Sequence, residues 1–333
     1  MENLTFKALW VTEQSTHSYP RTIVERQIAD LPAGEVLIKV AYSALNYKDA
    51  LSATGNKGIT RRYPHTPGID AAGTVAHSTD ARFREEDEVL VTGYDLGMNT
   101  AGGFADYIRV PAAWVVKLPA GLNLHDSMVY GTAGFTAALS VFKMQLNGLT
   151  PERGSVLVIG ATGGVGSIAV AILAKLGYSV TAVTGKPEQQ AFLQQLGAQE
   201  ILSRESLKDD PQRPLLKTRW AGVVDTVGGE LLVSALKATH YDGQVACCGM
   251  VAATQLAMTI FPFILRGVNL LGIASAECKM ALRTRLWELL ATSWKIDTRL
   301  LATECDLATL NDVYFDKILQ GQVHGRIIVN LSA

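Results

Sequence analysis

Cysteine is scarce in this chain of 333 residues, which contains four. Cys247 and Cys248 are adjacent, Cys278 and Cys305 stand apart, and no pair has the CxxC spacing of a thiolate metal site. The sequence therefore predicts neither a disulfide framework nor a cysteine metal cluster. We expect these side chains to be small and at least partly buried.

An excess of charge of one sign is also missing. Thirty Lys and Arg residues face 31 Asp and Glu residues, the formal net charge is -1, and there is no basic run. Proteins that bind nucleic acids or anionic membranes concentrate basic residues. We therefore expect a small neutral or anionic ligand and no nucleic-acid partner.

Long hydrophobic runs are absent as well. No stretch of 18 uncharged apolar residues occurs, and the opening MENLTFKALW lacks the cationic start and apolar core of a signal peptide. We expect no membrane partner and a cytoplasmic location.

The chain does have ample material for a core, because 48% of its residues are hydrophobic, and its length fits two domains. Before residue 130, short apolar runs between Pro, Gly and Asp turns predict a strand-rich domain; the runs are VLIKVAY, AGTVA, DEVLVTG and WVVKLP. After it, a long helix over 132–149 leads into apolar strands that alternate with helices. This alternation predicts an α/β region with a doubly wound parallel sheet. The last strand, GRIIVNL, is expected to return to the first domain.

A glycine-rich turn lies inside the alternating region, where residues 155–178 read SVLVIGATGGVGSIAVAILAKLGY. Gly160, Gly163, Gly164 and Gly166 follow a strand and precede a helix that starts near Val165. Glycines let the backbone approach a pyrophosphate, and the helix amino terminus presents free N–H groups to it. The pattern predicts a dinucleotide site; the alternative is a glycine-rich turn without a ligand.

The residues at the end of the next strand indicate which dinucleotide the site binds. An NAD site usually carries an acidic residue about 20 positions beyond the glycines. Here AVTGKPEQQ places Thr184 and Lys186 there instead. A hydroxyl and an ammonium suit a 2′-phosphate, whereas a carboxylate would repel it. We predict NADPH; the alternative is that Lys186 is only a solvated loop residue.

Several motifs together resemble one family: YGTAGFTAAL, SALNYKDALSATG, PGIDAAG, GATGGVG, VVDTVGG and FPFILRGVNLLGI. They are similar to the medium-chain dehydrogenase/reductase superfamily, and within it to the zinc-free quinone oxidoreductase branch, in the subgroup that includes acryloyl-CoA reductases. The resemblance implies a GroES-like, β-rich catalytic domain over 1–127 and 298–333 and a Rossmann NADP-binding domain over 128–297. It also implies further cofactor-binding residues: Thr132, Thr162, Val165, Arg204, Gly249 and Arg326.

The resemblance also bears on zinc. Zinc-dependent relatives carry a Cys where this chain has Asn46, and a His-Glu pair where it has Ile69 and Asp70. The loop over 93–107 has none of the cysteines that hold a structural zinc in those relatives, and the six histidines show no ligand spacing. Because a catalytic zinc normally needs three protein ligands, we predict no metal.

Chemistry without zinc favours reduction of a carbon–carbon double bond conjugated to a carbonyl over oxidation of an unactivated alcohol. Hydride then enters at the β-carbon, and hydrogen-bond donors stabilise the developing enolate. NYKDA and YPHTPGID supply candidate polar groups, from which we select Asn46, Tyr47 and Asp70 as catalytic residues. Two alternatives stay open: Asn46 and Asp70 could bond each other as a structural replacement for zinc, and Tyr47 could be packing.

The substrate stays open among acryloyl-CoA or another acyl-CoA, a small activated alkene and a quinone. The chain departs from the acryloyl-CoA reductase pattern by lacking a tryptophan in GMNTAGG and by carrying Ala274 in GIAS. The alternative function is a non-catalytic NADPH-binding sensor or structural protein on the same fold. The apolar edge strand NLLGIAS and the resemblance together predict a homodimer.

Overall fold

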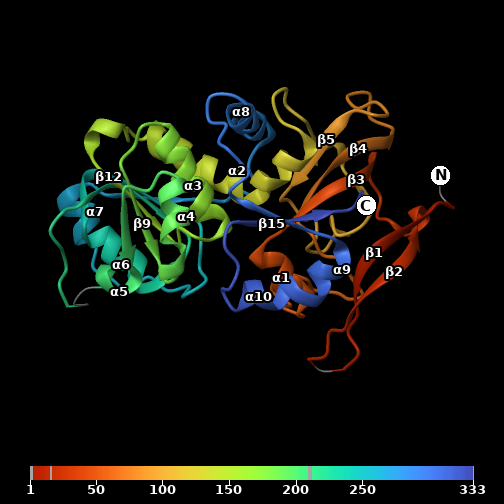
Figure 1. The fold of residues 1–333 in the computed structure, drawn as a ribbon, viewed down its shortest axis with the longest axis horizontal. Helices are drawn as coiled ribbons and strands as arrows, with labels where there is room; N and C mark the ends of the chain where they lie inside the picture. The colour runs from red at the N-terminus through yellow and green to blue at the C-terminus, as the bar shows by residue number, and fades with distance from the viewer. Residues whose placement is uncertain (1–2, 16, 209–211, 333) are drawn as a thin grey trace. The chain divides into compact units, whose positions relative to one another are not determined.

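The computed structural model describes residues 3–15, 17–208 and 212–332 (Figure 1). The chain divides into two compact units. The first unit comprises Met1–Thr132, Ala276–Ala291 and Leu301–Ala333, and the second comprises Ala133–Ser275 and Thr292–Leu300.

The first unit is built on a seven-stranded sheet with the order β14-β15-β3-β4-β5-β7, in which β6 also pairs with β3. Its strands are β3 (Val36–Leu45), β4 (Asp70–Ser78), β5 (Glu88–Thr92), β6 (Tyr107–Val110), β7 (Val116–Lys117), β14 (Ala302–Cys305) and β15 (Arg326–Asn330). β15 pairs antiparallel with β3, which confirms that the last strand returns to this unit. Branched side chains such as Val36, Ile38 and Val91 form the core beneath the sheet.

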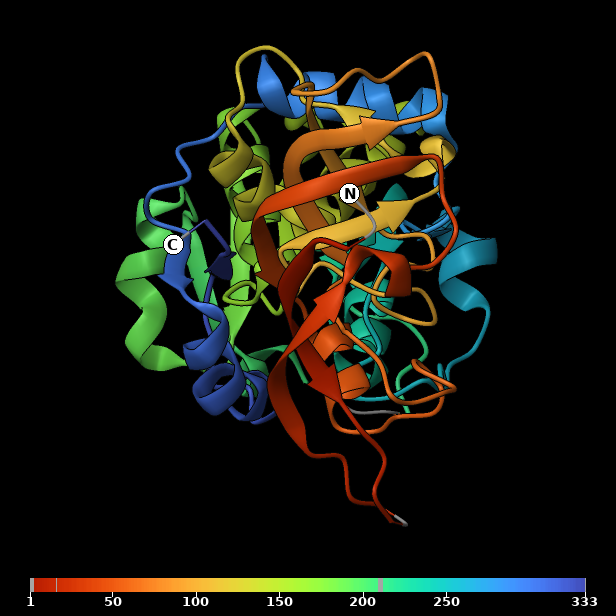
Figure 2. The same cartoon turned by 90° about the vertical axis from the view of Figure 1, so that its right-hand side faces the viewer.

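A separate hairpin of β1 (Thr5–Val11) and β2 (Arg21–Gln27) lies beside this sheet (Figure 2). The helical elements of the first unit are short apart from α8. They are η1 (Ile28–Asp30), α1 (Tyr47–Ala53), η2 (Ala112–Trp114), α8 (Met280–Ala291), α9 (Leu307–Thr309), the π-helical η5 (Leu310–Tyr314) and α10 (Phe315–Leu319).

The second unit contains a six-stranded, all-parallel sheet with the order β10-β9-β8-β11-β12-β13. Its strands are β8 (Val156–Ile159), β9 (Val180–Thr184), β10 (Glu200–Ser203), β11 (Trp220–Asp225), β12 (Thr239–Cys247) and β13 (Asn269–Gly272). The strand order reverses direction at β8, which is the switch point where open α/β sheets bind ligands. The predicted doubly wound sheet is confirmed.

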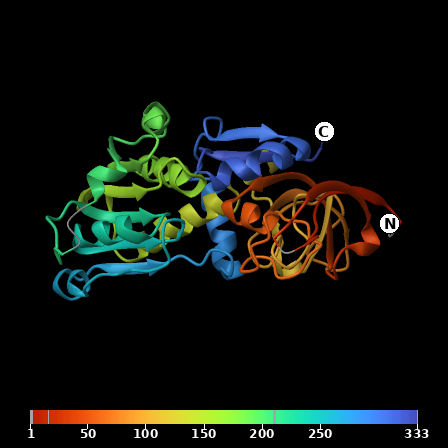
Figure 3. The same cartoon turned by 90° about the horizontal axis from the view of Figure 1, so that it is seen from below.

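Helices connect these strands. They are η3 (Pro151–Arg153), α3 (Gly164–Lys175), η4 (Pro187–Gln189), α4 (Gln190–Gln195), α5 (Arg204–Leu207), α6 (Gly229–Lys237) and α7 (Phe261–Arg266). Helix α2 (Leu124–Leu146) contributes to both units and is interrupted by Gly131, which is not helical. β13 and α7 lie at one outer edge of the sheet (Figure 3).

The division into units differs from the expected domain bounds in the segment Ala276–Ala291, which groups with the first unit. The reason is the buried Arg283 of α8, whose guanidinium donates to the Thr92 carbonyl at 2.7 Å and to the Ala276 carbonyl at 2.8 Å. The domain bounds expected from the sequence, 1–127 with 298–333 and 128–297, stay a prediction. No helix in the described ranges combines the length and the apolar character that a membrane span requires.

Candidate active site

The glycine turn of the second unit connects β8 to α3. Gly160 has a φ of +75°, a conformation that disfavours other residues. A Cβ on Gly166 would collide with the Gly160 carbonyl, and Gly163 is the residue that caps α3. The strand and helix therefore pack closely, and the first N–H groups of α3, from Gly164, Val165 and Gly166, have no carbonyl one turn earlier to bond. This geometry fits a pyrophosphate at the helix terminus.

Three further predicted residues come together at the ends of β9 and β10. The Thr184 hydroxyl accepts a hydrogen bond from the Lys186 amide at 3.0 Å and lies 3.4 Å from the Thr162 hydroxyl. A Cβ on Gly185 would lie 2.6 Å from the Arg204 guanidinium carbon, so Arg204 packs on this turn. Partial burial lowers the pKa of Lys186, and the neighbouring Arg204 lowers it further. Two adjacent cations and a hydroxyl fit a phosphate at this position.

Gly249 follows β12 and packs directly on the Thr226 carbonyl, where any side chain would collide. Thr132 and Arg326, which the family resemblance also assigns to the cofactor, belong to the first unit instead. There they join the predicted catalytic residues.

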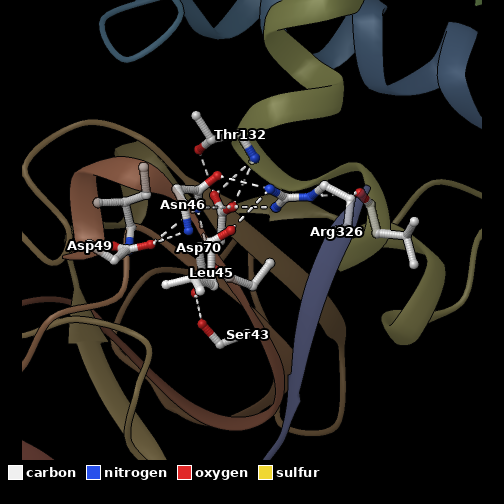
Figure 4. A network of polar contacts seen from close by, with 10 residues as sticks. Ser43, Leu45, Asn46, Asp49, Asp70, Thr132 and Arg326 are labelled. Carbon is white, nitrogen blue, oxygen red and sulfur yellow. Dashed lines mark hydrogen bonds and ion pairs between the residues drawn. The ribbon is translucent and has the colours of Figure 1, made fainter. Parts of the chain in front are cut away.

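A buried polar network forms the centre of the first unit (Figure 4). Asn46 caps α1, Asp49 lies in its first turn, Asp70 begins β4, Thr132 follows the break in α2, and Arg326 begins β15. The exposed fractions of Asp49 and Asp70 are 0%, that of Arg326 is 3%, and that of Asn46 is 9%.

Asn46 is fully engaged in this network. Its Nδ2 donates to Asp70 Oδ2 at 2.9 Å, to the Ala44 carbonyl at 3.1 Å and to Asp49 Oδ2 at 3.3 Å. Its Oδ1 accepts from Arg326 Nη1 at 3.2 Å. Since both amide hydrogens already have acceptors, the Asn46 side chain has no donor left for a ligand.

Asp70 is the acceptor on which the network converges. Its two oxygens accept hydrogen bonds from the Thr132 amide at 3.0 and 2.9 Å and from the Thr132 hydroxyl, and Arg326 Nη2 lies 3.5 Å from Oδ2. Burial raises the pKa of Asp70, and Arg326 and Thr132 oppose this rise. A Cβ on Gly131 would lie 2.5 Å from Asp70 Oδ2 and 2.9 Å from Arg326 Nη2, so only glycine fits at the break in α2.

The three predicted catalytic residues thus have different surroundings. Asn46 and Asp70 bond each other, as in the structural alternative, whereas Tyr47 is 36% exposed. No described residue forms a hydrogen bond with the Tyr47 hydroxyl. Sequence reasoning did not find that Thr132 and Arg326 belong to this network, because 280 residues separate Arg326 from Asn46.

The network does not fit zinc. In the described part of the chain, no three His, Cys, Asp or Glu side chains are grouped so that they could hold a metal ion. The oxygens of Asp49 and Asp70 already accept N–H and O–H hydrogen bonds, and the positive charge beside Asp70 is the Arg326 guanidinium.

Asp49 is the second buried carboxyl group of the network. Its oxygens accept from the amides of Asn46 and Ile69, each at 2.8 Å. Burial raises the pKa of Asp49 from 3.8 to about 7, and the nearby Asp70 raises it as well. The folded protein therefore binds this proton more tightly than the unfolded chain does.

This difference predicts a pH dependence of stability. The stabilisation from the proton on Asp49 is complete below about pH 3.8 and is lost as the pH rises to about 7. The side chain of Asp49→Asn cannot titrate. Raising the pH across this window should therefore lower the free energy of unfolding of the parent by on the order of 2 to 4 kcal/mol more than that of the variant. Urea unfolding of both proteins at several pH values measures this. The exposed Asp312→Asn is the control, and parallel curves for the parent and Asp49→Asn would contradict the assignment.

Family models match both parts of the chain. "Alcohol dehydrogenase GroES-like domain" matches residues 32–120, and "Zinc-binding dehydrogenase" matches residues 164–292. The second description names a metal whose ligands this chain does not assemble in its described residues.

Three relatives are similar over nearly the whole chain. "Putative quinone oxidoreductase YhfP" of Bacillus subtilis is 49% identical over 91% of this chain and 92% of its own length. The solved structure of Bacillus subtilis yhfP with NAD bound superposes with a TM-score of 0.95 and is 47% identical, covering 99% of this chain and 100% of that chain. "Acrylyl-CoA reductase AcuI" of Ruegeria pomeroyi is 45% identical over 98% and 100% of the two chains. The yhdH oxidoreductase of Salmonella enterica in complex with NADP is 43% identical over 98% and 100%, with a TM-score of 0.93.

These identities and the shared fold confirm the resemblance in the sequence: the chain belongs to the medium-chain dehydrogenase/reductase superfamily of oxidoreductases, in the group that contains these quinone oxidoreductase and acrylyl-CoA reductase relatives.

Proposed function

We propose that the protein is a zinc-independent, NADPH-dependent reductase of an activated carbon–carbon double bond or a quinone, acting on a small molecule in the cytoplasm. The observation that carries this proposal is the buried network of Asn46, Asp70 and Arg326. Asn46 and Asp70 lie where the resemblance places a Cys ligand and the Glu of a His-Glu pair in zinc-dependent relatives, and here they bond each other and Arg326.

NADPH is the cofactor in this proposal, and when bound it supplies the hydride. The amides at the start of α3 bind its pyrophosphate, and Thr184, Lys186 and Arg204 bind its 2′-phosphate. One relative has been solved with NAD and another with NADP, so family membership leaves the choice open. Lys186 and Arg204 favour the phosphorylated form, because NAD lacks the 2′-phosphate that these two cations would contact.

The substrate gains a hydride at its β-carbon and a proton at its α-carbon, and negative charge develops on its carbonyl oxygen between the two events. Tyr47, which is 36% exposed, donates a hydrogen bond to that oxygen through its hydroxyl, and it or water delivers the proton. Asn46 and Asp70 are positioning residues in this scheme. They fix the start of α1, where Tyr47 is the first helical residue.

The proposed activity is tested by following NADPH absorbance with a panel of acryloyl-CoA, small enones and quinones. At least one of these substrates should be reduced, and a chelator should leave the rate unchanged. Tight NADPH binding without turnover of any substrate would favour the non-catalytic sensor.

Tyr47→Phe tests the role of the phenol. The variant should lose roughly a hundredfold in kcat, because it removes one donor to the developing charge. Its Tm should equal that of the parent, since the hydroxyl bonds no described residue. Tyr241→Phe, at another exposed tyrosine, is the matched control and should keep full activity. Full activity of Tyr47→Phe would remove Tyr47 from the mechanism.

Lys186→Ala tests cofactor choice. Loss of one charge-assisted phosphate contact should weaken NADPH binding about tenfold or more and leave NADH binding nearly unchanged. Lys175→Ala, at the end of α3, serves as the control. Titration of each variant with both cofactors measures this, and equal affinity of the parent for NADPH and NADH would contradict the proposed preference.

We also propose a homodimer formed through β13. This strand ends the sheet order, Leu270 in it is 37% exposed, and apolar side chains nearby in sequence are more exposed still. They are Met250, Val251, Ile260, Phe261, Ile264 and Leu265. An unpaired apolar edge strand can pair with a second copy across a two-fold axis.

Sedimentation tests the dimer. The parent should sediment at twice the chain mass of 35.8 kDa at micromolar concentration. The double substitution Ile264→Glu and Leu270→Glu should shift it toward the monomer, because it places charges on the paired edge. Leu146→Glu changes an exposed leucine elsewhere, with an exposed fraction of 69% close to the 71% of Ile264, and should have no effect. A monomeric parent would refute the proposal.

A further inference from the structure

Asp225 is a buried carboxyl group of the second unit that the proposed chemistry does not use. It is the last residue of β11, and its exposed fraction is 0%. No described Lys, Arg or His side chain forms an ion pair with it, whereas the equally buried Asp70 of the first unit pairs with Arg326. Burial without a cation disfavours the charged form of a carboxyl group.

The groups that face Asp225 are uncharged donors. Its Oδ1 accepts from the Val227 amide at 3.2 Å and from the Gly228 amide at 3.1 Å, and its Oδ2 lies 3.0 Å from the Gly228 nitrogen. From β12, the Cys247 thiol lies 3.8 Å from Oδ2, and the Cys248 thiol donates to the Asp225 carbonyl at 3.1 Å. Burial raises the pKa of both thiols, so neither carries a charge at neutral pH.

These donors keep the carboxyl group of Asp225 ionised at neutral pH. Burial raises its pKa from 3.8 to about 6, and the hydrogen bonds from Gly228, Val227 and Cys247 oppose this rise. The stabilisation from a proton on Asp225 is complete below about pH 3.8 and is lost as the pH rises to about 6. The folded protein thus holds an unpaired negative charge that lowers its stability, which is typical of a group with a functional role.

Asp225 lies at the edge of the sheet where the glycine turn begins. In the register of β11 and β8 it is opposite Ile159, the residue before Gly160. The Thr226 hydroxyl donates to the Ile159 carbonyl at 2.8 Å, and a Cβ on Gly160 would collide with the same hydroxyl. The turn that follows Asp225 therefore packs directly on the glycine turn.

The two halves of the cofactor belong on opposite sides of β8. A dinucleotide lies across the switch point of such a sheet, with one mononucleotide on each side. In the proposed function, Lys186 and Arg204 bind the 2′-phosphate at the ends of β9 and β10, which assigns the adenosine half to that side. The nicotinamide half then belongs at the ends of β11 and β12, on the side of Asp225.

We infer that the buried carboxylate of Asp225 favours the oxidised form of the bound nicotinamide cofactor over the reduced form, and thereby promotes hydride donation. This inference rests on the proposed function, because it uses the proposed position of the 2′-phosphate. When a hydride, with its electron pair, passes from NADPH to the β-carbon of the substrate, the nicotinamide ring becomes positively charged. A fixed negative charge in the protein interior on the same side of the sheet stabilises that positive charge.

Cofactor titrations of the parent and of Asp225→Asn test the inference. The measured quantity is the Kd for NADP⁺ divided by the Kd for NADPH, at about pH 7.5. Asn keeps the shape of the side chain and removes its charge, so this ratio should rise about tenfold in the variant. Asp242→Asn is the matched control, because Asp242 is exposed and lies in the first half of β12, whereas Cys247, the residue opposite Asp225, ends that strand. Its ratio should equal that of the parent.

The pH dependence of the same ratio is an independent measurement that needs no variant. As the pH falls from about 8 to about 5.5, Asp225 takes up a proton and its attraction for the oxidised ring is lost, so the ratio of the parent should rise. The 2′-phosphate titrates in the same range, but NADP⁺ and NADPH both carry it, and its effect cancels in the ratio. In Asp225→Asn the ratio should stay constant.

The outcomes separate this inference from the proposed function. Equal weakening of both cofactor forms in Asp225→Asn would show that Asp225 only shapes the turn, and it would overturn the inference, as would an unchanged ratio. If Asp225→Asn does not fold, the parent decides, because a ratio that stays constant between about pH 8 and 5.5 also overturns the inference. Substrate turnover would still support the reductase in each case, whereas failure of the parent to bind NADPH would contradict the proposed function and this inference with it.

Discussion

The ion pair between Asp70 and Arg326 is the interaction on which the first unit depends. Asp70 begins β4, Arg326 begins β15, and Thr132 and Asn46 bring α2 and α1 to the same carboxylate. Removing one partner of a buried pair leaves an uncompensated charge, which typically costs about 3 to 5 kcal/mol. The backbone has adapted to this pair, because Gly131 interrupts α2 where a Cβ would meet both charged groups.

Hydrogen bonds and an ion pair hold together the elements that surround Asp70. A metal ion holds its ligands through charge and fixed geometry. Here the Arg326 guanidinium supplies the charge, donating to the Val129 and Leu45 carbonyls at 3.1 Å and to Asn46 Oδ1 at 3.2 Å. Tyr47, the residue after Asn46, is 36% exposed and forms no hydrogen bond of its hydroxyl with a described residue, which is why the proposed chemistry uses Tyr47 and not Asn46.

The charges at the ends of β9 and β10 suit the second unit to a phosphorylated cofactor. In the second unit, helix-terminal amides and the neighbouring Lys186 and Arg204 suit a dinucleotide phosphate. The chain's net charge of -1 does not reveal these two cations, because 31 acidic residues offset the 30 Lys and Arg residues.

The sequence by itself determined the doubly wound sheet, the glycine turn, the Thr184–Lys186 segment and the strand that returns to the first unit, because periodicity and turn residues are local signals. Tertiary structure decided what surrounds each candidate. Asn46 and Asp70 are buried and form hydrogen bonds or an ion pair with Arg326. Of the three predicted catalytic residues, Tyr47 alone is exposed. The contact between Asn46 and Arg326 joins residues 280 positions apart, and no pattern of neighbouring residues in the sequence indicates such a contact or the burial that results from it.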